Sequence, residues 1–62
     1  MCNNLAVIRK ERRLTQKELA DKLSVTRQYI SDIERNQKIP SLSMALNISL
    51  ILNTSVEKIF HL

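Results

Sequence analysis

Short segments with the apolar spacing of helices follow one another along the whole sequence, and only brief breaks separate them. No stretch alternates polar and apolar residues for long enough to form a sheet. Glycine is absent, which excludes a glycine-rich phosphate loop. The pattern therefore predicts an all-α fold of five short helices. A chain of 62 residues is too short to be subdivided, so we expect one domain over residues 1–62.

Polar residues suited to capping begin the predicted helices. Thr15 and Glu18 form a Thr-x-x-Glu capping box, in which each side chain bonds to a free amide of the other residue. Asn36 and Asn53 are expected to end two helices, because Asn tolerates the left-handed conformation. In chain order the predicted helices cover about residues 4–13 (beginning at Asn3 or Asn4), 15–23, 26–35, 41–52 and 56–60.

Charge is distributed unevenly along the chain. The formal net charge is +4, and residues 1–40 carry all of it, with nine Lys and Arg against five Asp and Glu. Residues 41–62 contain only Glu57 and Lys58 as charged residues. This distribution suggests one surface that faces a polyanion and a separate apolar surface. On charge alone, an ordinary solvated surface explains the basic residues equally well.

Signals for other classes of protein are weak. No apolar run approaches the length of a membrane span, and the N-terminus does not resemble a signal peptide. Cys2 and His61 have no partners at metal-ligand spacing, so we expect no metal, no cofactor and no enzymatic activity. A redox-sensing role for Cys2 is the less favoured alternative. The lone cysteine is typical of a protein of the reducing cytoplasm.

Residues 15–35 carry the central signal, a helix, a short turn and a second helix. The small Ala20 allows the two helices to cross closely, and Val25 fills the turn. This arrangement holds the second helix rigidly and leaves its outer face free. Such a helix fits the major groove of DNA, with its first residues nearest the base edges.

The runs 14–20, 23–27 and 30–36 resemble the phage-repressor and Cro-type helix-turn-helix family of small bacterial and phage transcription regulators. Residues 40–46 and 56–60 are similar to the fourth and fifth helices of that family, so the resemblance covers nearly the whole chain. It implies a repressor-type five-helix fold and a stand-alone DNA-binding domain. It also implies a cytoplasmic, nucleoid-associated location.

The same resemblance implies a role for each matching residue. Gln16 would clamp a phosphate, and Arg27, Gln28, Ser31 and Asp32 would face the bases. Arg bonds guanine and Gln bonds adenine through paired contacts. The residues expected to contact DNA are Gln16, Lys17, Thr26, Arg27, Gln28, Tyr29, Ser31, Asp32, Arg35 and Lys38.

Several of these residues also have a plainer explanation. Asp32 either accepts from cytosine or simply pairs with Arg35 three positions later, and Lys17 is more simply a solvated residue. The family pairs the residue matching Arg9 with the one matching Glu34, and we interpret this ion pair as structural. The family often carries Gly at the position of Ser24, which suggests that the turn here is either strained or has a different geometry.

The last third of the chain predicts an interface. Residues 41–62 include twelve apolar residues, more than one small monomer can cover. We therefore expect a homodimer through residues 48–62, centred on Leu50, Asn53, Val56 and Phe60. The alternative is that all of these residues belong to the core of one chain.

Together these features predict a homodimeric, sequence-specific regulator that binds double-stranded DNA at an inverted repeat. Repression is the simpler prediction than activation, because it needs only occupancy of a promoter. The rival prediction is a protein-interaction module, such as an antitoxin subunit, that uses its apolar C-terminal face. A membrane-surface peptide is disfavoured, since the basic and apolar residues do not share one amphipathic helix.

Overall fold

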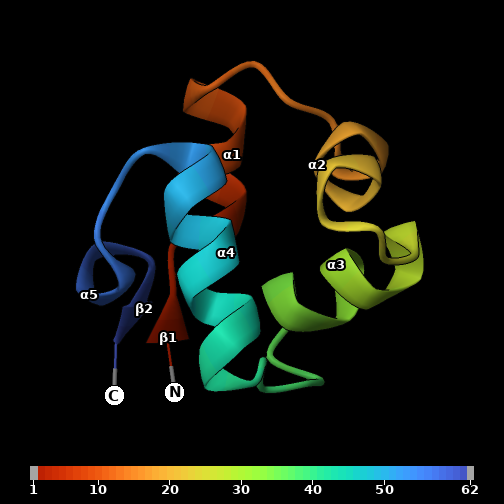
Figure 1. Ribbon diagram of the computed structural model, residues 1–62. Coiled ribbons are helices and arrows are strands. Elements are labelled where there is room, and N and C mark those ends of the chain that lie inside the picture. The colour runs from red at the N-terminus through yellow and green to blue at the C-terminus, as the bar shows by residue number, and fades with distance from the viewer. Residues whose placement is uncertain (1, 62) are drawn as a thin grey trace.

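A computed structural model describes residues 2–61 and the side chains of residues 3–60 (Figure 1). The prediction of an all-α fold with five helices is confirmed. The elements are β1 (Cys2–Asn3), α1 (Leu5–Glu11), α2 (Gln16–Leu23), α3 (Arg27–Glu34), α4 (Leu42–Leu52), α5 (Val56–Ile59) and β2 (Phe60–His61). The predictions for Cys2 and His61 concern side chains that lie outside the described ones.

A short pairing of the two chain ends is the main departure from the predicted elements. Asn3 pairs with Phe60 in an antiparallel ladder of two-residue strands, and both ends lie on the same side of the molecule (Figure 1). The backbone N–H of Asn4 extends the contact by donating to Ile59 O at 2.7 Å. Asn3 is therefore not helical, and α5 ends before Phe60. A strand of two residues leaves no alternation to detect in a sequence.

Side-chain caps begin the three longest helices. Thr15 Oγ1 accepts from Glu18 N at 3.0 Å, and Thr15 N donates to Glu18 Oε1 at 2.9 Å, which completes the capping box. Thr26 and Ser41 accept in the same way from the third residue of α3 and α4. Ser55, in contrast, makes no side-chain hydrogen bond to the start of α5. The capping signals read from the sequence therefore place α2, α3 and α4 correctly.

In the described part of the chain, four residues adopt the left-handed backbone conformation, although none of them is glycine. The expected helix ends Asn36 and Asn53 have φ of 60° and 54°. Ser24 has φ of 59° and closes the turn between α2 and α3, in a conformation that serine adopts less readily than glycine. Arg13, after α1, also has φ of 59°, which the sequence did not suggest.

One apolar core lies between the helices, and every helix contributes to it. Its fully buried side chains are Leu5, Leu19, Ile30, Ile33, Ile48, Leu52 and Ile59. Arg12 ties α1 to the end of α4, since its Nε donates to Leu52 O at 2.8 Å. The core holds α2 and α3 against α4 and leaves the outer side of α3 exposed to solvent.

Candidate nucleic-acid interface

The turn between α2 and α3 fixes how α3 is presented. Val25 N donates to Ala20 O at 3.0 Å, and the left-handed Ser24 reverses the chain just before it. Ala20 and Ile30 are buried where the two helices meet, as the helical spacing predicts. Arg27 and Gln28, in the first turn of α3, are exposed. The first turn of α3 is thus a polar, solvent-facing surface on a fixed helix.

A buried ion pair connects α1 to the end of α3. Arg9 Nε lies 2.7 Å from Glu34 Oε2, and the two side chains are 9% and 7% exposed. Arg9 also donates from Nη1 to Leu14 O at 2.8 Å. The structure therefore brings together the two residues that the family resemblance paired. Their position inside the protein fits a structural role, because a buried charge is stable only when it is paired.

Gln16 extends this ion pair to the surface. Its Nε2 donates to Glu34 Oε1 at 2.9 Å, and its Oε1 accepts from Arg27 Nη1 at 3.0 Å. An ionised carboxylate only accepts, so Glu34 turns the amide nitrogen of Gln16 inward and its oxygen outward. The guanidinium of Arg27 is consequently held at the start of α3 by a chain of contacts that begins at Arg9.

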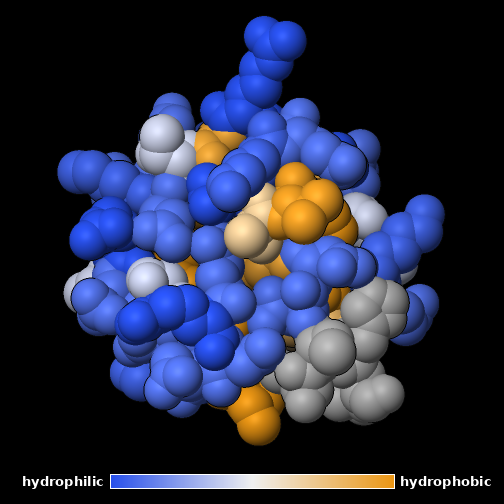
Figure 2. Space-filling view, turned by 180° about the vertical axis from the view of Figure 1, so that it is seen from behind, coloured by the Kyte–Doolittle hydropathy of each residue, from blue (hydrophilic) through white to orange (hydrophobic). Residues whose placement is uncertain are grey.

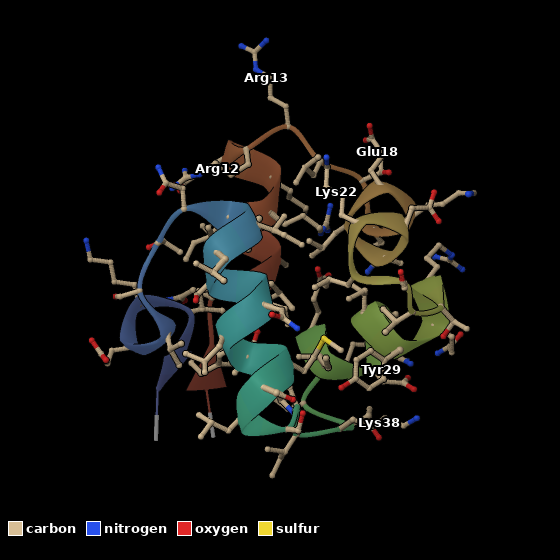
Figure 3. The ribbon with its side chains drawn as sticks, viewed as in Figure 1. Arg12, Arg13, Glu18, Lys22, Tyr29 and Lys38 are labelled. Carbon is tan, nitrogen blue, oxygen red and sulfur yellow. The ribbon has the colours of Figure 1, made fainter. Side chains whose placement is uncertain are left out.

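A second polar cluster lies further along α3, around Asp32. Its carboxylate accepts from Gln28 Nε2 at 2.9 Å and from Arg35 Nη2 at 3.0 Å. Lys38 Nζ lies 3.9 Å from the other carboxylate oxygen and 5.7 Å from the ring centre of Tyr29 (Figure 3). The hydrogen bond from Gln28, followed by that from Arg35, lowers the pKa of Asp32. Asp32 is therefore an ionised acceptor for its own neighbours.

The remaining predicted DNA contacts lie on the same two helices. Thr26 caps α3 by accepting from Tyr29 N at 3.1 Å, and Ser31 is half-buried on that helix. Lys17 pairs with Asp21 on the exposed side of α2 at 3.1 Å, in line with a solvated residue. Sequence reasoning missed the contacts of Gln16 with Arg27 and Glu34. They join residues 11 and 18 positions apart, and no local pattern signals them.

The predicted interface residues are scattered between surface and core. Leu50 is 76% exposed, Asn53 is exposed and Val56 is half-buried. Phe60, however, is only 8% exposed, because it begins β2 and its side chain packs in the core. The structure thus places Phe60 inside the protomer rather than on its surface.

Helix α4 exposes further apolar surface that the sequence analysis did not single out. Leu42 and Leu46 lie at intervals of four residues before Leu50 and are 74% and 48% exposed. Leu50 also borders an open hollow of about 240 Å³, whose other lining residues are Lys22, Leu23, Asn47 and Ile51. The face of the molecule seen from behind is largely hydrophilic, with smaller apolar areas (Figure 2).

Two other features are absent from the described part of the chain. No helix there is long and apolar enough to cross a membrane. No group of three or more His, Cys, Asp or Glu residues within the same part is placed to hold a metal ion.

A polar helix held across a second one by a tight turn defines the helix-turn-helix class of DNA-binding proteins. The comparison with protein families agrees with this geometry. The chain belongs to the helix-turn-helix family, whose model matches residues 5–59. It is accordingly a DNA-binding transcription regulator by family and not an enzyme.

Individual relatives show how the similarity is distributed. An uncharacterised transcriptional regulator of Methanocaldococcus jannaschii is 42% identical over 60 residues, which cover 97% of the chain and 91% of the relative. The immunity repressor protein of Bacillus phage phi105 is 54% identical over 39 residues, but these cover 63% of the chain and 27% of the repressor. The chain thus spans only a fraction of the phage relative.

Among solved structures, the fold is similar to SinR, the master regulator for biofilm formation, crystallised in complex with DNA. The TM-score is 0.77 and the identity 37%, with 86% of each chain covered.

Proposed function

We propose that this protein is a sequence-specific repressor that binds an inverted-repeat operator as a homodimer. One observation carries the proposal. The first two residues of α3 are exposed, and each is held by a hydrogen bond, Arg27 by Gln16 and Gln28 by Asp32. Two oriented polar side chains at the start of an exposed helix are what reading base edges requires.

In this proposal α3 enters the major groove and phosphate contacts flank it. Arg27 bonds guanine and Gln28 bonds adenine, the bases that match their donors and acceptors. The start of α2, at Gln16, faces one phosphate through its free backbone amides. Beyond the end of α3, Lys38 and Arg35 supply positive charge toward another part of the DNA backbone. These phosphate contacts supply most of the affinity and make it fall with salt.

Repression and dimerisation have separate support. A relative is named an immunity repressor, and repression needs only that a promoter is occupied. For the homodimer, the exposed Leu46 and Leu50 with Asn53 and Val56 offer an apolar surface at the end of α4. Two-fold assembly places two α3 helices one helical turn apart on DNA, so each protomer reads one half-site.

Selection from a randomised pool of double-stranded DNA at about 150 mM salt tests the proposal. We expect enrichment of an inverted repeat whose half-sites lie about 10 base pairs apart. The variant Arg27→Ala removes the preference at one position of each half-site. Lys10→Ala is the matched control, because it removes the same charge from an exposed residue of α1, outside both the α3 surface and the proposed dimer interface. Binding without any enriched sequence contradicts the proposal.

The exposed leucines of α4 favour a second candidate function, a protein-interaction module such as an antitoxin subunit. Sedimentation separates the two. A protein that is a monomer at tens of micromolar contradicts the homodimer and leaves the apolar surface for a different partner. A dimer that Leu50→Glu converts to a folded monomer supports the first proposal.

A further inference from the structure

Asp32 stands out because it is an acidic residue on the helix proposed to face a polyanion. Its side chain is only 16% exposed, and both of its carboxylate oxygens lie near donor or cationic side chains. Oδ1 accepts from Gln28 and Arg35, at 2.9 Å and 3.0 Å, and Oδ2 lies 3.9 Å from Lys38 Nζ. With its acceptor sites turned toward neighbours, Asp32 is poorly placed to read a base itself.

The two cations explain how the protein tolerates this charge. Arg35 and Lys38 together carry two positive charges next to the one negative charge of Asp32. The cluster as a whole therefore has a net positive charge and attracts phosphates. The lowered pKa of Asp32 keeps its carboxyl ionised, and an ionised carboxyl only accepts hydrogen bonds.

This restriction determines how Gln28 is oriented. A carboxylate repels the amide oxygen, so the nitrogen of Gln28 must face Asp32, as it does at 2.9 Å. One N–H of the amide is then in use, and the second N–H and the oxygen remain. These form one donor beside one acceptor, which matches adenine N7 and N6 in the major groove. Guanine offers two acceptors there, and the amide oxygen faces repulsion from guanine O6.

We propose that Asp32 is a positioning residue that makes Gln28 select adenine over guanine at its base position. The inference rests on the proposed DNA-binding function and adds the base preference and the residue that sets it. It also assigns Asp32 a role different from either one that its sequence position suggested. Asp32 acts through Gln28 rather than by contacting DNA.

The test uses the DNA duplex obtained by selection and versions that differ from it at one base pair of each half-site. We expect wild-type protein to prefer adenine at the Gln28 position by about 5- to 150-fold. Asp32→Ala reduces that preference by about threefold or more, while preferences at other positions stay. Asp21→Ala is the matched control, because it removes an equal charge from an exposed ion pair with Lys17 and leaves the preference unchanged.

A double-mutant cycle separates positioning from a general structural role. In the Gln28→Ala background, the change Asp32→Ala has no further effect on base preference if Asp32 acts through Gln28. An equal loss of affinity for every duplex, with the ratio unchanged, overturns the inference. A further fall in preference in the absence of the Gln28 amide overturns it too.

Nuclear magnetic resonance of the free protein tests the contact without DNA. We expect Asp32→Ala to shift the Gln28 side-chain amide signals and to lower their order parameter, while Asp21→Ala changes neither. Unchanged Gln28 signals overturn the inference whatever the DNA results are. If the signals change as expected but wild-type protein prefers no sequence, the proposed function fails, and the base preference built on it fails with it.

Discussion

The N-terminal half of this small domain, helices α1 to α3, and the C-terminal half, helices α4 and α5, are stabilised in different ways. Helices α1 to α3 carry most of the charge, and a connected set of polar contacts runs from the buried Arg9 to the exposed Arg27. Helix α4 has no charged residue, packs Ile48 and Leu52 into the core and exposes Leu50. Polar contacts fix direction, whereas apolar contacts mainly supply burial.

This difference suits the two proposed tasks. Base reading needs side chains that point in one direction before DNA arrives. The hydrogen bonds that Arg27 and Gln28 donate to Gln16 and Asp32 supply that direction. Association of two copies needs exposed apolar area, which α4 offers without any like charges to repel.

The largest expected difference in stability is between removing a buried polar group from the N-terminal half and removing one from the C-terminal half. Glu34→Ala leaves Arg9 as an unpaired buried charge and lowers the free energy of unfolding by about 3–5 kcal/mol. That is comparable to the whole stability of a domain of this size. In α4, Ser49 is also buried, but its hydroxyl donates to Leu46 O at 2.7 Å, a carbonyl of its own helix. Ser49→Ala therefore changes the stability by less than about 0.5 kcal/mol.

Urea denaturation followed by circular dichroism measures both changes. Replacing both charges with apolar residues, Arg9→Met with Glu34→Leu, restores much of the stability, since no unpaired charge remains. If the free energy of unfolding of Glu34→Ala lies within about 1 kcal/mol of the wild-type value, the distinction between the two halves is wrong.

The next effect concerns the helix caps. Thr15 closes a complete capping box at α2, and Thr15→Ala costs about 1 kcal/mol because it leaves Glu18 N without its acceptor. Ser55 makes no side-chain bond at α5, so Ser55→Ala costs only a few tenths of a kcal/mol. Thermal melts of the two variants under one buffer compare them directly. Equal shifts in Tm contradict the assignment of a side-chain cap to α2 and none to α5.

A smaller effect is expected at the left-handed helix ends. Ser24 and Asn53 have nearly the same φ, 59° and 54°, but Asn adopts this conformation more readily than Ser. Ser24→Gly removes the backbone strain and, after the entropy that glycine adds to the unfolded chain, stabilises the protein by about 0.5 kcal/mol. Asn53→Gly leaves the stability of the protein about unchanged. If urea denaturation shows that Asn53→Gly stabilises the protein more than Ser24→Gly does, the expected order of the two positions is wrong.

These contrasts also show what a sequence of this kind predicts. The capping box at Thr15 and the helix ends at Asn36 and Asn53 depend on residues a few positions apart, so local chemistry is sufficient to find them. The pair Arg9 and Glu34 is separated by 25 positions and was available only through family resemblance. Its extension through Gln16 to Arg27 depends on how three helices pack, and no local pattern contains that information.

The apolar C-terminal part shows the complementary limit. Leu50 and Phe60 are both apolar, yet the first is 76% exposed and the second 8%. Phe60 begins the strand that pairs with Asn3, and strands of two residues are too short to recognise in a sequence. Composition therefore indicates an excess of apolar residues correctly but does not say which of them lie on the surface.

The smallest effect is a pH dependence that arises in α2 and α3. The capping bond with Thr15 lowers the pKa of Glu18, and the bond from Gln28 lowers the pKa of Asp32. A carboxyl whose pKa is lower in the folded state stabilises the protein above its unfolded pKa. That stability is lost as the pH falls through the folded pKa. We therefore expect Tm to be level near neutral pH and to fall once the pH drops below about 4.

The double variant Glu18→Gln and Asp32→Asn isolates this contribution, because neither replacement titrates. Its Tm falls less between about pH 6 and pH 3 than that of wild type, even if its Tm at neutral pH is lower. Glu57→Gln, on α5, serves as the control from the other half of the molecule. If the control flattens the acid branch as much as the double variant does, the acid sensitivity does not originate in α2 and α3, and the two halves do not differ in this respect.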